Sequence, residues 1–529
     1  MQDQSDDNTS RGIPMDRNPA SALDPGLYRS LIEHVTEWGV GYLGSLEGRP
    51  IRSEASPGEI LERLPAHPPE AGEGAAGWGA MLADLQGVIE PGLVHWQHPG
   101  FFAYFSCNAS APAIAGELAS ATLNVNGMLW ATSPAATELE MRVMDWCAEF
   151  FGLPRAFRSA PDPGGAMPDG GGVIQSTASE ATLAALLAAR TRLVRDGVPR
   201  DRITVYTSDQ AHSSVVKAAM IAGLADHPED SSRVRLIRSD PELRMEPREL
   251  ARRIEQDHSD GLVPALVVAT LGSTSTGAFD PLGPIASVLH GLEQRAWLHV
   301  DAAWAGAALV CPELRSFATG IDAADSVCIN PHKWLLTNFD CDLFWVRDRR
   351  ALTDSMSITP AYLRDVHSDA GAVTDYRDWH VPLGRRIRAL KLWFVIRHYG
   401  VEGLRTHIRR HITMAERIEA ALRSDPRLEV PVERSLALVC FRAAHEDPDT
   451  ADAITSDLVE RVNRSGRSLI TPTRIPLGAE RRVGPVARIS VGTVTTDDAA
   501  VDRLLEDIDA ALHRDPRVRR DAGPRPVVE

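Results

Sequence analysis

Lysine is scarce in this sequence. Of the 56 lysine and arginine residues only three are lysines: Lys217, Lys333 and Lys391. Arginine stays protonated in proteins and cannot act as an amine nucleophile, whereas lysine can. Any chemistry that needs an amine therefore has three candidates.

Other absences narrow the class of protein. No apolar run approaches the roughly 20 residues of a membrane helix, so we expect no membrane partner. The formal net charge of −16 disfavours nucleic acid as a partner. The six cysteines form no C-x-x-C pair and no basic and apolar leader opens the chain, so we expect a cytoplasmic protein.

A metal site is also not expected. His95 and His98 have a ligand-like spacing, and so do His407 and His411. Neither pair encloses a glutamate, and no third ligand stands nearby. We interpret all four as core or surface histidines.

The middle of the chain alternates β-rich and helical stretches, which predicts an α/β fold. In such a fold a mostly parallel sheet is covered by helices, and ligands bind at the carboxyl ends of the strands. Beyond Trp379 a helical pattern leads into a final α+β segment. The predicted strands are 202–207, 233–237, 265–271, 297–300, 326–329, 343–346, 436–441 and 486–491, and the predicted helices include 181–194, 249–256, 285–294 and 497–512.

Residues 93–137 contain a single charged side chain, that of Glu117, among many aromatic and small residues. Proline and asparagine interrupt this stretch, so it cannot span a membrane. We expect it to be buried within the protein or in an oligomer.

Residues 170–180 run from three glycines through small hydroxyl residues into a predicted helix. Thr177 and Glu180 have the spacing of a capping box, and the free N–H groups of a helix start suit a phosphate. No Gly-Lys-Ser/Thr follows, so this is not a Walker loop. A flexible loop with an ordinary helix cap is the alternative interpretation.

Two further candidates follow predicted strands. Asp301 ends an apolar strand, where its charge needs a cation or hydrogen bonds, although a turn aspartate is the simpler interpretation. Lys333 follows the next strand among Trp334 and two leucines, a setting that lowers an amine pKa by desolvation. A lysine whose head reaches water is the commoner case, and we expect it to apply to Lys217 and Lys391 within helices.

Taken together, these features match pyridoxal 5′-phosphate. A phosphate cradle, a carboxylate for a ring nitrogen and a lysine for an aldehyde are the three groups that this coenzyme needs. His212, after another strand, could stack on the ring, and a core or capping histidine is the default otherwise.

The residues resemble the group II pyridoxal-phosphate decarboxylases, and most closely the aromatic L-amino-acid decarboxylase branch. The resemblance covers about residues 24–512. The matching motifs lie at 98–105, 133–140, 172–180, 208–214, 299–303, 330–336 and 375–379.

This resemblance implies a fold type I enzyme and an obligate homodimer with active sites at the subunit interface. The implied organisation is a disordered tail (1–22), a helical dimer-interface segment (23–109), a large coenzyme domain (110–385), a small α+β domain (386–514) and a tail (515–529). Lys333 is implied to bind the coenzyme covalently, Asp301 to pair with the ring nitrogen, and His212 to stack on the ring. The remaining implied coenzyme contacts are Ala303, Thr274, Ala178, Ser179, Asn330 and His332.

The catalytic loop of the family matches residues 362–376, and its protonating tyrosine falls on Tyr362. Relatives with phenylalanine at that position resemble aldehyde synthases, so a tyrosine favours simple decarboxylation. The implied substrate pocket contains Trp96, Tyr104, Phe105, Asn126, Met128 and Gly384. Asn126 and Met128 stand where the animal aromatic enzymes carry Ile and Phe, and Ser106 and Cys107 replace Pro and Thr, whereas Gly384 matches the enzymes that accept indoles and catechols.

We therefore predict decarboxylation of a small-molecule L-amino acid, which is tryptophan, 5-hydroxytryptophan, DOPA, tyrosine or phenylalanine. One alternative is oxidative deamination to an aldehyde, and another is decarboxylation of a non-aromatic amino acid. A scaffold protein would require the loss of Lys333 or Asp301, and both are present.

Overall fold

The computed structural model describes residues 23–70, 77–161, 164, 167–358 and 366–518. The chain divides into two compact units, Met1–His98 and Pro99–Glu529. The domain boundaries predicted at 109/110 and 385/386 stay predictions. Within the described residues, no helix is both long and apolar enough to cross a membrane.

The described part of the first unit is helical. Its elements are α1 (Pro25–Ser45), η2 (Leu46–Gly48), α2 (Glu59–Arg63), α3 (Gly77–Asp84), η3 (Leu85–Ile89) and η4 (Glu90–Gly92). Asp24 caps α1 by accepting a hydrogen bond from the N–H of Leu27 at 2.8 Å. The buried carboxylate of Glu90 accepts the indole N–H of Trp38 at 2.7 Å and pairs with Arg49.

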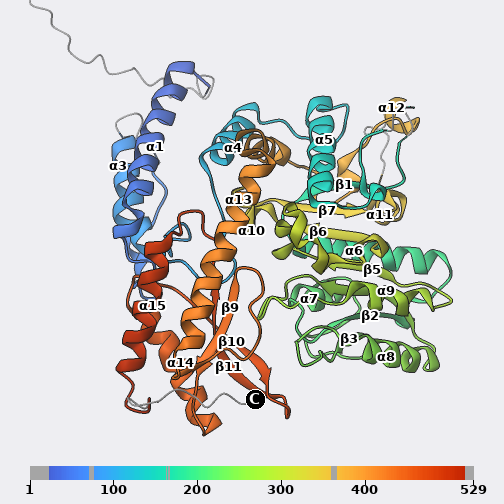
Figure 1. Cartoon of the computed structure of the whole chain (residues 1–529). Coiled ribbons are helices and arrows are strands. Elements are labelled where there is room, and N and C mark those ends of the chain that lie inside the picture. The colour runs from blue at the N-terminus through green and yellow to red at the C-terminus, as the bar shows by residue number, and fades with distance from the viewer. Residues whose placement is uncertain (1–22, 71–76, 162–163, 165–166, 359–365, 519–529) are drawn as a thin grey trace, which may run out of the picture. The chain divides into compact units, whose positions relative to one another are not determined.

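The second unit contains a sheet that, among the described residues, has seven strands in the order β1-β7-β6-β5-β4-β2-β3 (Figure 1). Neighbouring strands from β3 to β6 pair in parallel, and β7 runs antiparallel to both β6 and β1. The mostly parallel α/β fold is therefore confirmed. The strands are β1 (Gly171–Gln175), β2 (Ile203–Ser208), β3 (Val234–Ile237), β4 (Val263–Thr270), β5 (Trp297–Asp301), β6 (Ser326–Ile329) and β7 (Asp342–Val346).

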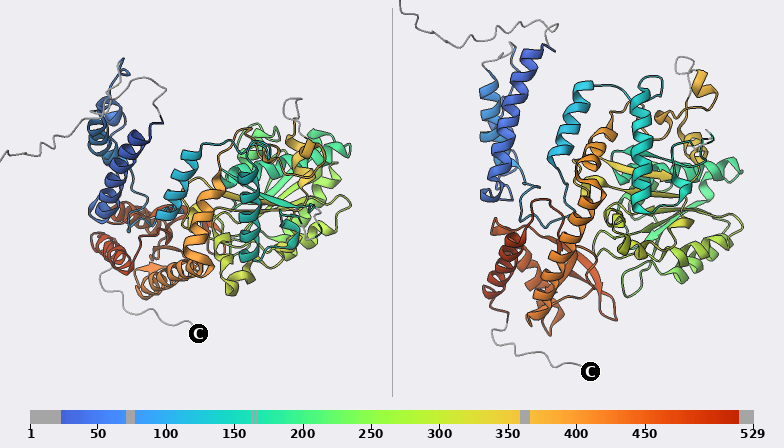
Figure 2. Two further views of the ribbon diagram at one scale, coloured as in Figure 1. Left: turned by 90° about the horizontal axis from the view of Figure 1, so that it is seen from above. Right: turned by 45° about the horizontal axis from the view of Figure 1, so that its top comes forward.

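Helices cover both faces of this sheet, and the views of Figures 1 and 2 agree on this. On one face α6 (Ala178–Arg195) and α7 (Ser214–Ile221) pack on the strands, and on the other α5 (Pro134–Phe151), α8 (Pro247–Ser259) and α9 (Leu282–His290) do so. Because both faces are covered, the strands are rich in apolar residues, and every residue of β5 and β6 is buried.

A second, antiparallel sheet has the order β10-β11-β9-β8 within the described residues. Its strands are β8 (Leu428–Glu429), β9 (Leu438–Ala443), β10 (Thr471–Leu477) and β11 (Arg482–Ser490), and its helices are α14 (Pro448–Arg464) and α15 (Asp498–His513). Helix α13 (Arg388–Ser424) precedes it and is interrupted at Gly400, where φ is 64°. The other elements of this unit are α4 (Ala111–Leu123), η5 (Arg155–Phe157), η6 (Arg200–Arg202), η7 (Ala305–Val310), η8 (Pro312–Ala318), η9 (Ile321–Ala323), α10 (Pro331–Trp334), α11 (Arg349–Met356), α12 (Val366–Asp369) and η11 (Tyr376–Asp378).

Two local expectations were wrong. Two of the three glycines that open residues 170–180, Gly171 and Gly172, belong to the buried strand β1 rather than to a loop. A Cβ on Gly172 would come within 2.4 Å of Met144 Cε and 2.6 Å of Trp345 Cδ1. Lys391 does not extend to water either: its side chain is 1% exposed, and its Nζ lies 2.8 Å from Glu117 Oε2.

Candidate functional site

A cavity of about 220 Å³ lies at the edge of the large sheet where the parallel strands end. Residues that follow the carboxyl ends of β1, β2, β4, β5 and β6 line it, as expected for a ligand site of this fold. The lining residues are Phe105, Thr177, Ala178, Ser179, His212, Ser214, Thr270, Gly272, Thr274, Asp301, Ala303, Trp304, Asn330, His332, Lys333 and Phe339. All nine predicted coenzyme-binding residues are in this set.

Lys333 lies on the short helix α10, directly after β6. Its Nζ is 5.2 Å from the ring centroid of Phe105. Burial lowers the pKa of Lys333 below its usual value, although the carboxylate of Asp301 opposes this shift. A larger share of the amine is therefore neutral, and so nucleophilic, than for a lysine in water.

Asp301 is the last residue of β5, and hydrogen bonds hold its carboxylate in place. Its Oδ1 accepts the backbone N–H of Ala303 at 3.1 Å, and the thiol of Cys328 lies 3.8 Å from the same atom. On the same strand, Nδ1 of His299 contacts Ser326 Oγ at 2.8 Å. Burial lowers the pKa of His299 to about 4, so its ring is neutral near pH 7.

The start of α6 forms another wall of the cavity. The predicted capping box is wrong, because the Thr177 side chain makes no capping hydrogen bond. Glu180 Oε2 instead accepts both the N–H of Ser176, at 3.1 Å, and its hydroxyl, at 2.6 Å. The hydroxyl of Thr177 is therefore not used as a helix cap, and the first N–H groups of a helix lack partners within it.

His332 and Asn330 flank the lysine. Nδ1 of His332 lies 3.0 Å from the backbone nitrogen of Cys341, and burial followed by the charge of Lys333 lowers its pKa to about 3. The imidazole is therefore neutral at physiological pH. Asn330 is tied to the segment that follows β5 through its backbone N–H, which donates to the carbonyl of Ala303 at 3.0 Å.

His212 and Thr274 line the same cavity but remain exposed in the single chain. Nδ1 of His212 accepts the N–H of Ser214 at 3.1 Å, which sets the orientation of the ring. Partial burial lowers the pKa of His212, so its ring is also neutral near pH 7. A neutral, oriented ring can lie against an aromatic ligand.

Several polar atoms in this cavity have no partner within the described residues. The Oδ1 atom of Asn330 and the Oγ1 atom of Thr270 are both buried and unpaired. Buried polar atoms normally have partners, so such orphans point to a ligand that supplies them. An amine, a carboxylate, hydroxyls and a helix start, together with these orphans, fit an anionic aldehyde with a basic ring, as pyridoxal phosphate is.

The predicted substrate residues fall into separate groups. Phe105 lines the cavity, stacked on Trp304 with ring centroids 4.5 Å apart. Tyr104 is 56% exposed, does not line the cavity and has a φ of 50°. Trp96 is half-buried within the first unit, and its substrate contact stays a prediction.

Asn126, Met128 and Gly384 lie together but do not line the cavity of Lys333 in the same chain. The N–H of Gly127 donates to the carbonyl of Arg385 at 2.9 Å, which joins the two segments. Asn126 and Gly384 are exposed in the single chain, and Met128 is half-buried.

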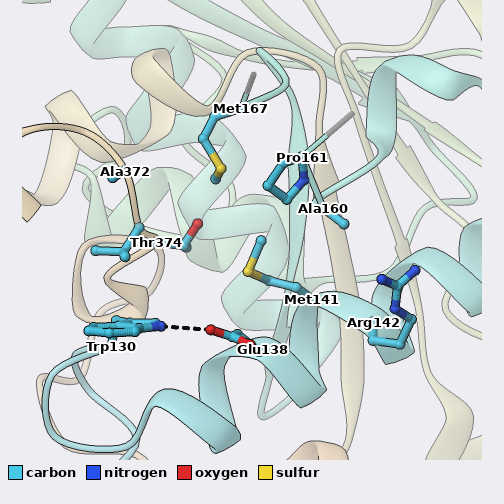
Figure 3. Close-up of a pocket in the computed structure, with 10 residues that line it drawn as sticks. Trp130, Glu138, Met141, Arg142, Ala160, Pro161, Met167, Ala372 and Thr374 are labelled. Carbon is cyan, nitrogen blue, oxygen red and sulfur yellow. Dashed lines mark hydrogen bonds between the residues drawn. The ribbon is translucent and has the colours of Figure 1, made fainter. Parts of the chain in front are cut away.

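Tyr362 lies outside the described residues, and its role stays a prediction. On the C-terminal flank of its segment, Asp375 accepts the N–H of Trp130 at 3.0 Å and the hydroxyl of Ser368 at 2.7 Å. A second cavity of about 300 Å³ borders this anchor (Figure 3). There the indole N–H of Trp130 donates to Glu138 Oε1 at 3.0 Å, across from the side chains of Met141 and Met167.

Two residues near the site had no signal in the sequence. The N–H of Asn108 donates to the carbonyl of His332 at 2.9 Å, and its Nδ2 donates to the carbonyl of Lys333. Arg488 on β11 places its guanidinium carbon 4.3 Å from the ring centroid of Phe105. Both come from segments more than 100 residues away in the chain, so only the fold brings them to Lys333.

Comparison with known proteins identifies the family. A model described as the pyridoxal-dependent decarboxylase conserved domain matches residues 57–444. The aromatic-L-amino-acid decarboxylase of Rattus norvegicus is 39% identical over 499 residues, which cover 92% of this chain and 97% of the relative. The phenylacetaldehyde synthase of Arabidopsis thaliana is 41% identical over 481 residues, which cover 89% and 94%.

Among solved structures, that of Oryza sativa TDC with PLP and tryptamine matches with a TM-score of 0.86 at 37% identity, and the match covers 92% of this chain and 98% of that one. The chain belongs to the pyridoxal-dependent decarboxylase family. It is an amino-acid decarboxylase of the aromatic-L-amino-acid decarboxylase type, and its coenzyme is pyridoxal 5′-phosphate.

Proposed function

We propose that this protein decarboxylates aromatic L-amino acids to the corresponding amines and CO2. The observation that carries the proposal is the single cavity that contains Lys333, Asp301, His212 and the start of α6. Relatives named for aromatic amino acids, which match over most of this chain, support the aromatic class.

Each group of the cavity has a proposed task. The Lys333 amine would hold the coenzyme, and the start of α6 and His332 would hold its phosphate. The carboxylate of Asp301 would favour a protonated ring nitrogen. When bound, pyridoxal phosphate supplies the electron-withdrawing ring that accepts the electron pair left as CO2 departs.

His212 and Ala303 both line the cavity, and they would contact opposite faces of the coenzyme ring and so orient it. Tyr362 is the proposed donor of the proton to the former α-carbon. Burial lowers the pKa of both His212 and His332, so neither ring adds a positive charge to the cavity near pH 7.

The second candidate function is oxidative deamination to an aldehyde, because a phenylacetaldehyde synthase is among the relatives. A tyrosine at position 362 favours the decarboxylase. Purified protein incubated with the coenzyme and each of phenylalanine, tyrosine, tryptophan, DOPA and 5-hydroxytryptophan is expected to release amine and CO2 in equal amounts. Consumption of O2 with release of peroxide and aldehyde instead of amine would support the synthase, and a Lys333→Ala variant should abolish either reaction.

We further propose a homodimer in which each chain completes the cavity of the other. Asn126, Met128 and Gly384 do not line the cavity of their own chain, and residues 93–137 are almost free of charge. The α4 side chains Ile114, Leu118 and Leu123 are exposed, which provides an apolar surface for a second copy. Light scattering after gel filtration is expected to give twice the chain mass of 57.5 kDa, and a monomer with full activity would contradict the proposal.

The cytoplasm is the proposed location, because all six cysteines are free thiols and five of them are buried. Fractionation of source cells with an antibody against the protein is the direct test. Recovery outside the cytoplasmic fraction would contradict it.

A further inference from the structure

The side-chain amide of Asn126 has a defined orientation. Its Oδ1 accepts the backbone N–H of Arg385 at 3.0 Å. A backbone N–H can only donate, so the oxygen must face Arg385 and the NH2 group must face away. The NH2 group contacts Met128 Sδ at 3.5 Å, and a thioether is only a weak hydrogen-bond acceptor.

Space next to this amide is open. A Cβ built on Gly384 would meet nothing within 4 Å except Asn126, whose Nδ2 would be 3.6 Å away and Oδ1 4.0 Å away. Asn126 itself is exposed in the single chain. The amide donors and the thioether of Met128 therefore border a volume that the chain itself does not fill.

Arg385 ties this group to the strand that leads into the phosphate cradle. Its Nη2 donates to the carbonyl of Ile174 on β1 at 2.9 Å and pairs with the buried Glu140 at 2.6 Å. Glu140 Oε1 also accepts the N–H of Ile174 at 2.8 Å. The position of Asn126 is therefore fixed by a buried ion pair rather than by a loose surface loop.

We infer that Asn126 selects aromatic substrates that carry a hydrogen-bond acceptor on the ring, such as phenols, catechols and hydroxyindoles. The inference rests on the proposed function, in which Asn126, Met128 and Gly384 face the cavity of the partner subunit. The thioether of Met128 contacts the ring and the absence of a side chain at Gly384 leaves room for it. The NH2 group of Asn126 then donates to the ring oxygen.

This arrangement distinguishes hydroxylated from unsubstituted substrates. When a substrate without a ring oxygen binds, the NH2 group of Asn126 loses its hydrogen bond to water and gains no other acceptor. A site built to bond a hydroxyl disfavours the analogue that lacks it. Since Asn126 is not deeply buried in the single chain, we expect a modest preference, about 10-fold in kcat/KM for tyrosine over phenylalanine. The same direction is expected for 5-hydroxytryptophan over tryptophan.

The test is kcat/KM for both substrate pairs with the wild-type holoenzyme and with Asn126→Leu. The ratio within each pair is the readout, because a general loss of activity or coenzyme cancels in it. Asn126→Leu is expected to bring the ratio close to one, chiefly by slowing the hydroxylated substrate. Thr132→Val is the matched control: it removes a hydroxyl that donates to the carbonyl of Asn126 at 2.9 Å and leaves the amide in place, so the wild-type ratio is expected to persist.

Two results would overturn the inference, and they are distinguishable from a failure of the proposed function. Amine formation with equal kcat/KM within each pair removes the selectivity while the decarboxylase stands. A wild-type ratio retained in Asn126→Leu removes Asn126 as its cause. Absence of amine and CO2 from every aromatic substrate would instead overturn the proposed function, and the inference with it.

Discussion

The guanidinium carbon of Arg488 lies 4.3 Å from the ring centroid of Phe105, the ring that also lies 5.2 Å from the Nζ atom of Lys333. Arg488 is 3% exposed. Its Nη1 donates to the carbonyl of Tyr104 at 2.6 Å, whereas Nε and Nη2 have no hydrogen-bond partner within the described residues. Burial lowers the pKa of Arg488 to about 10, so it remains charged at neutral pH, and no carboxylate of the described part of the chain forms an ion pair with it.

A buried cation without a counter-ion makes the cavity beside it attractive to anions. Arg488→Met, which keeps much of the volume and removes the charge, is therefore expected to raise KM for the amino acid about 10-fold, or about 1.4 kcal/mol. Arg488→Lys should restore part of the affinity. Steady-state kinetics at saturating coenzyme provide the measurement, and an unchanged KM in Arg488→Met would show that the charge acts only on the packing of Phe105.

The three lysines offer an internal comparison of amine reactivity. Lys217 is exposed on α7, Lys391 is paired with Glu117, and burial lowers the pKa of Lys333. Brief acetylation of coenzyme-free protein at pH 7.5, followed by peptide mapping, is expected to modify Lys333 faster than Lys217. Saturation with pyridoxal phosphate should protect Lys333 from acetylation and leave the acetylation rate of Lys217 unchanged. Equal labelling of the two with and without coenzyme would be evidence against Lys333 as the coenzyme lysine.

Hybrid dimers test whether the substrate residues act on the cavity of the partner. Lys333→Ala disables the cavity of its own chain, whereas Gly384→Trp fills the space beside Asn126 and should disable the cavity of the other chain. Each variant alone is expected to be inactive. A purified hybrid of the two retains one intact site, so we expect about half of the wild-type activity per dimer. An inactive hybrid would indicate that both groups serve the same chain.

The ion pair between Lys391 and Glu117 joins α13 to α4. Helix packing is close here, because a Cβ on Gly116 would come within 2.6 Å of Lys391 Cα. Lys391→Met leaves Glu117 without this partner and is expected to cost about 2 kcal/mol of stability, less than for a fully buried pair because Glu117 is partly exposed. Lys217→Met, at an exposed lysine, is the control and should change the denaturation midpoint little. Equal midpoints for the two variants would contradict the prediction.

Acid is expected to destabilise the fold through its buried histidines. Burial lowers the pKa of His299 to about 4, against 6.5 for a histidine in water. Between these values the unfolded chain binds the proton and the folded chain does not, so stability falls as pH drops from 6.5 to 4. At pH 5 this difference in proton binding at His299 lowers the free energy of unfolding by about 2 kcal/mol. Burial lowers the pKa of six further histidines in the same direction: His95, His212, His332, His380, His407 and His411.

Thermal denaturation of wild type and His299→Gln between pH 7.5 and 5 measures this effect. The variant is expected to be less stable at pH 7.5, because it loses the contact with Ser326, but to lose less stability on acidification. Parallel curves for the two proteins would assign the acid sensitivity to other groups.

Much of the fold was predictable from local patterns. The predicted strand 326–329 coincides with β6, and β2, β3, β4, β5 and β7 fall within two residues of their predicted ends. Buried strands in a parallel sheet are continuous apolar runs, and such runs are visible in one dimension. Strand β1 was missed because its glycines, which let Met144 and Trp345 pack against the backbone, have the composition of a loop.

By itself, the amino-acid sequence determined the α/β class, the coenzyme and the cluster around Lys333, because those residues lie at or shortly after the carboxyl ends of strands, and strand ends are readable from hydrophobicity. Only the tertiary structure decided that Asn108 holds the backbone of Lys333, that Arg488 lies against Phe105, and that Asn126 and Gly384 form a group away from the cavity of their own chain. These relationships join segments that lie far apart along the chain, and no local pattern encodes which distant segments the packing of two sheets and their helices will bring together.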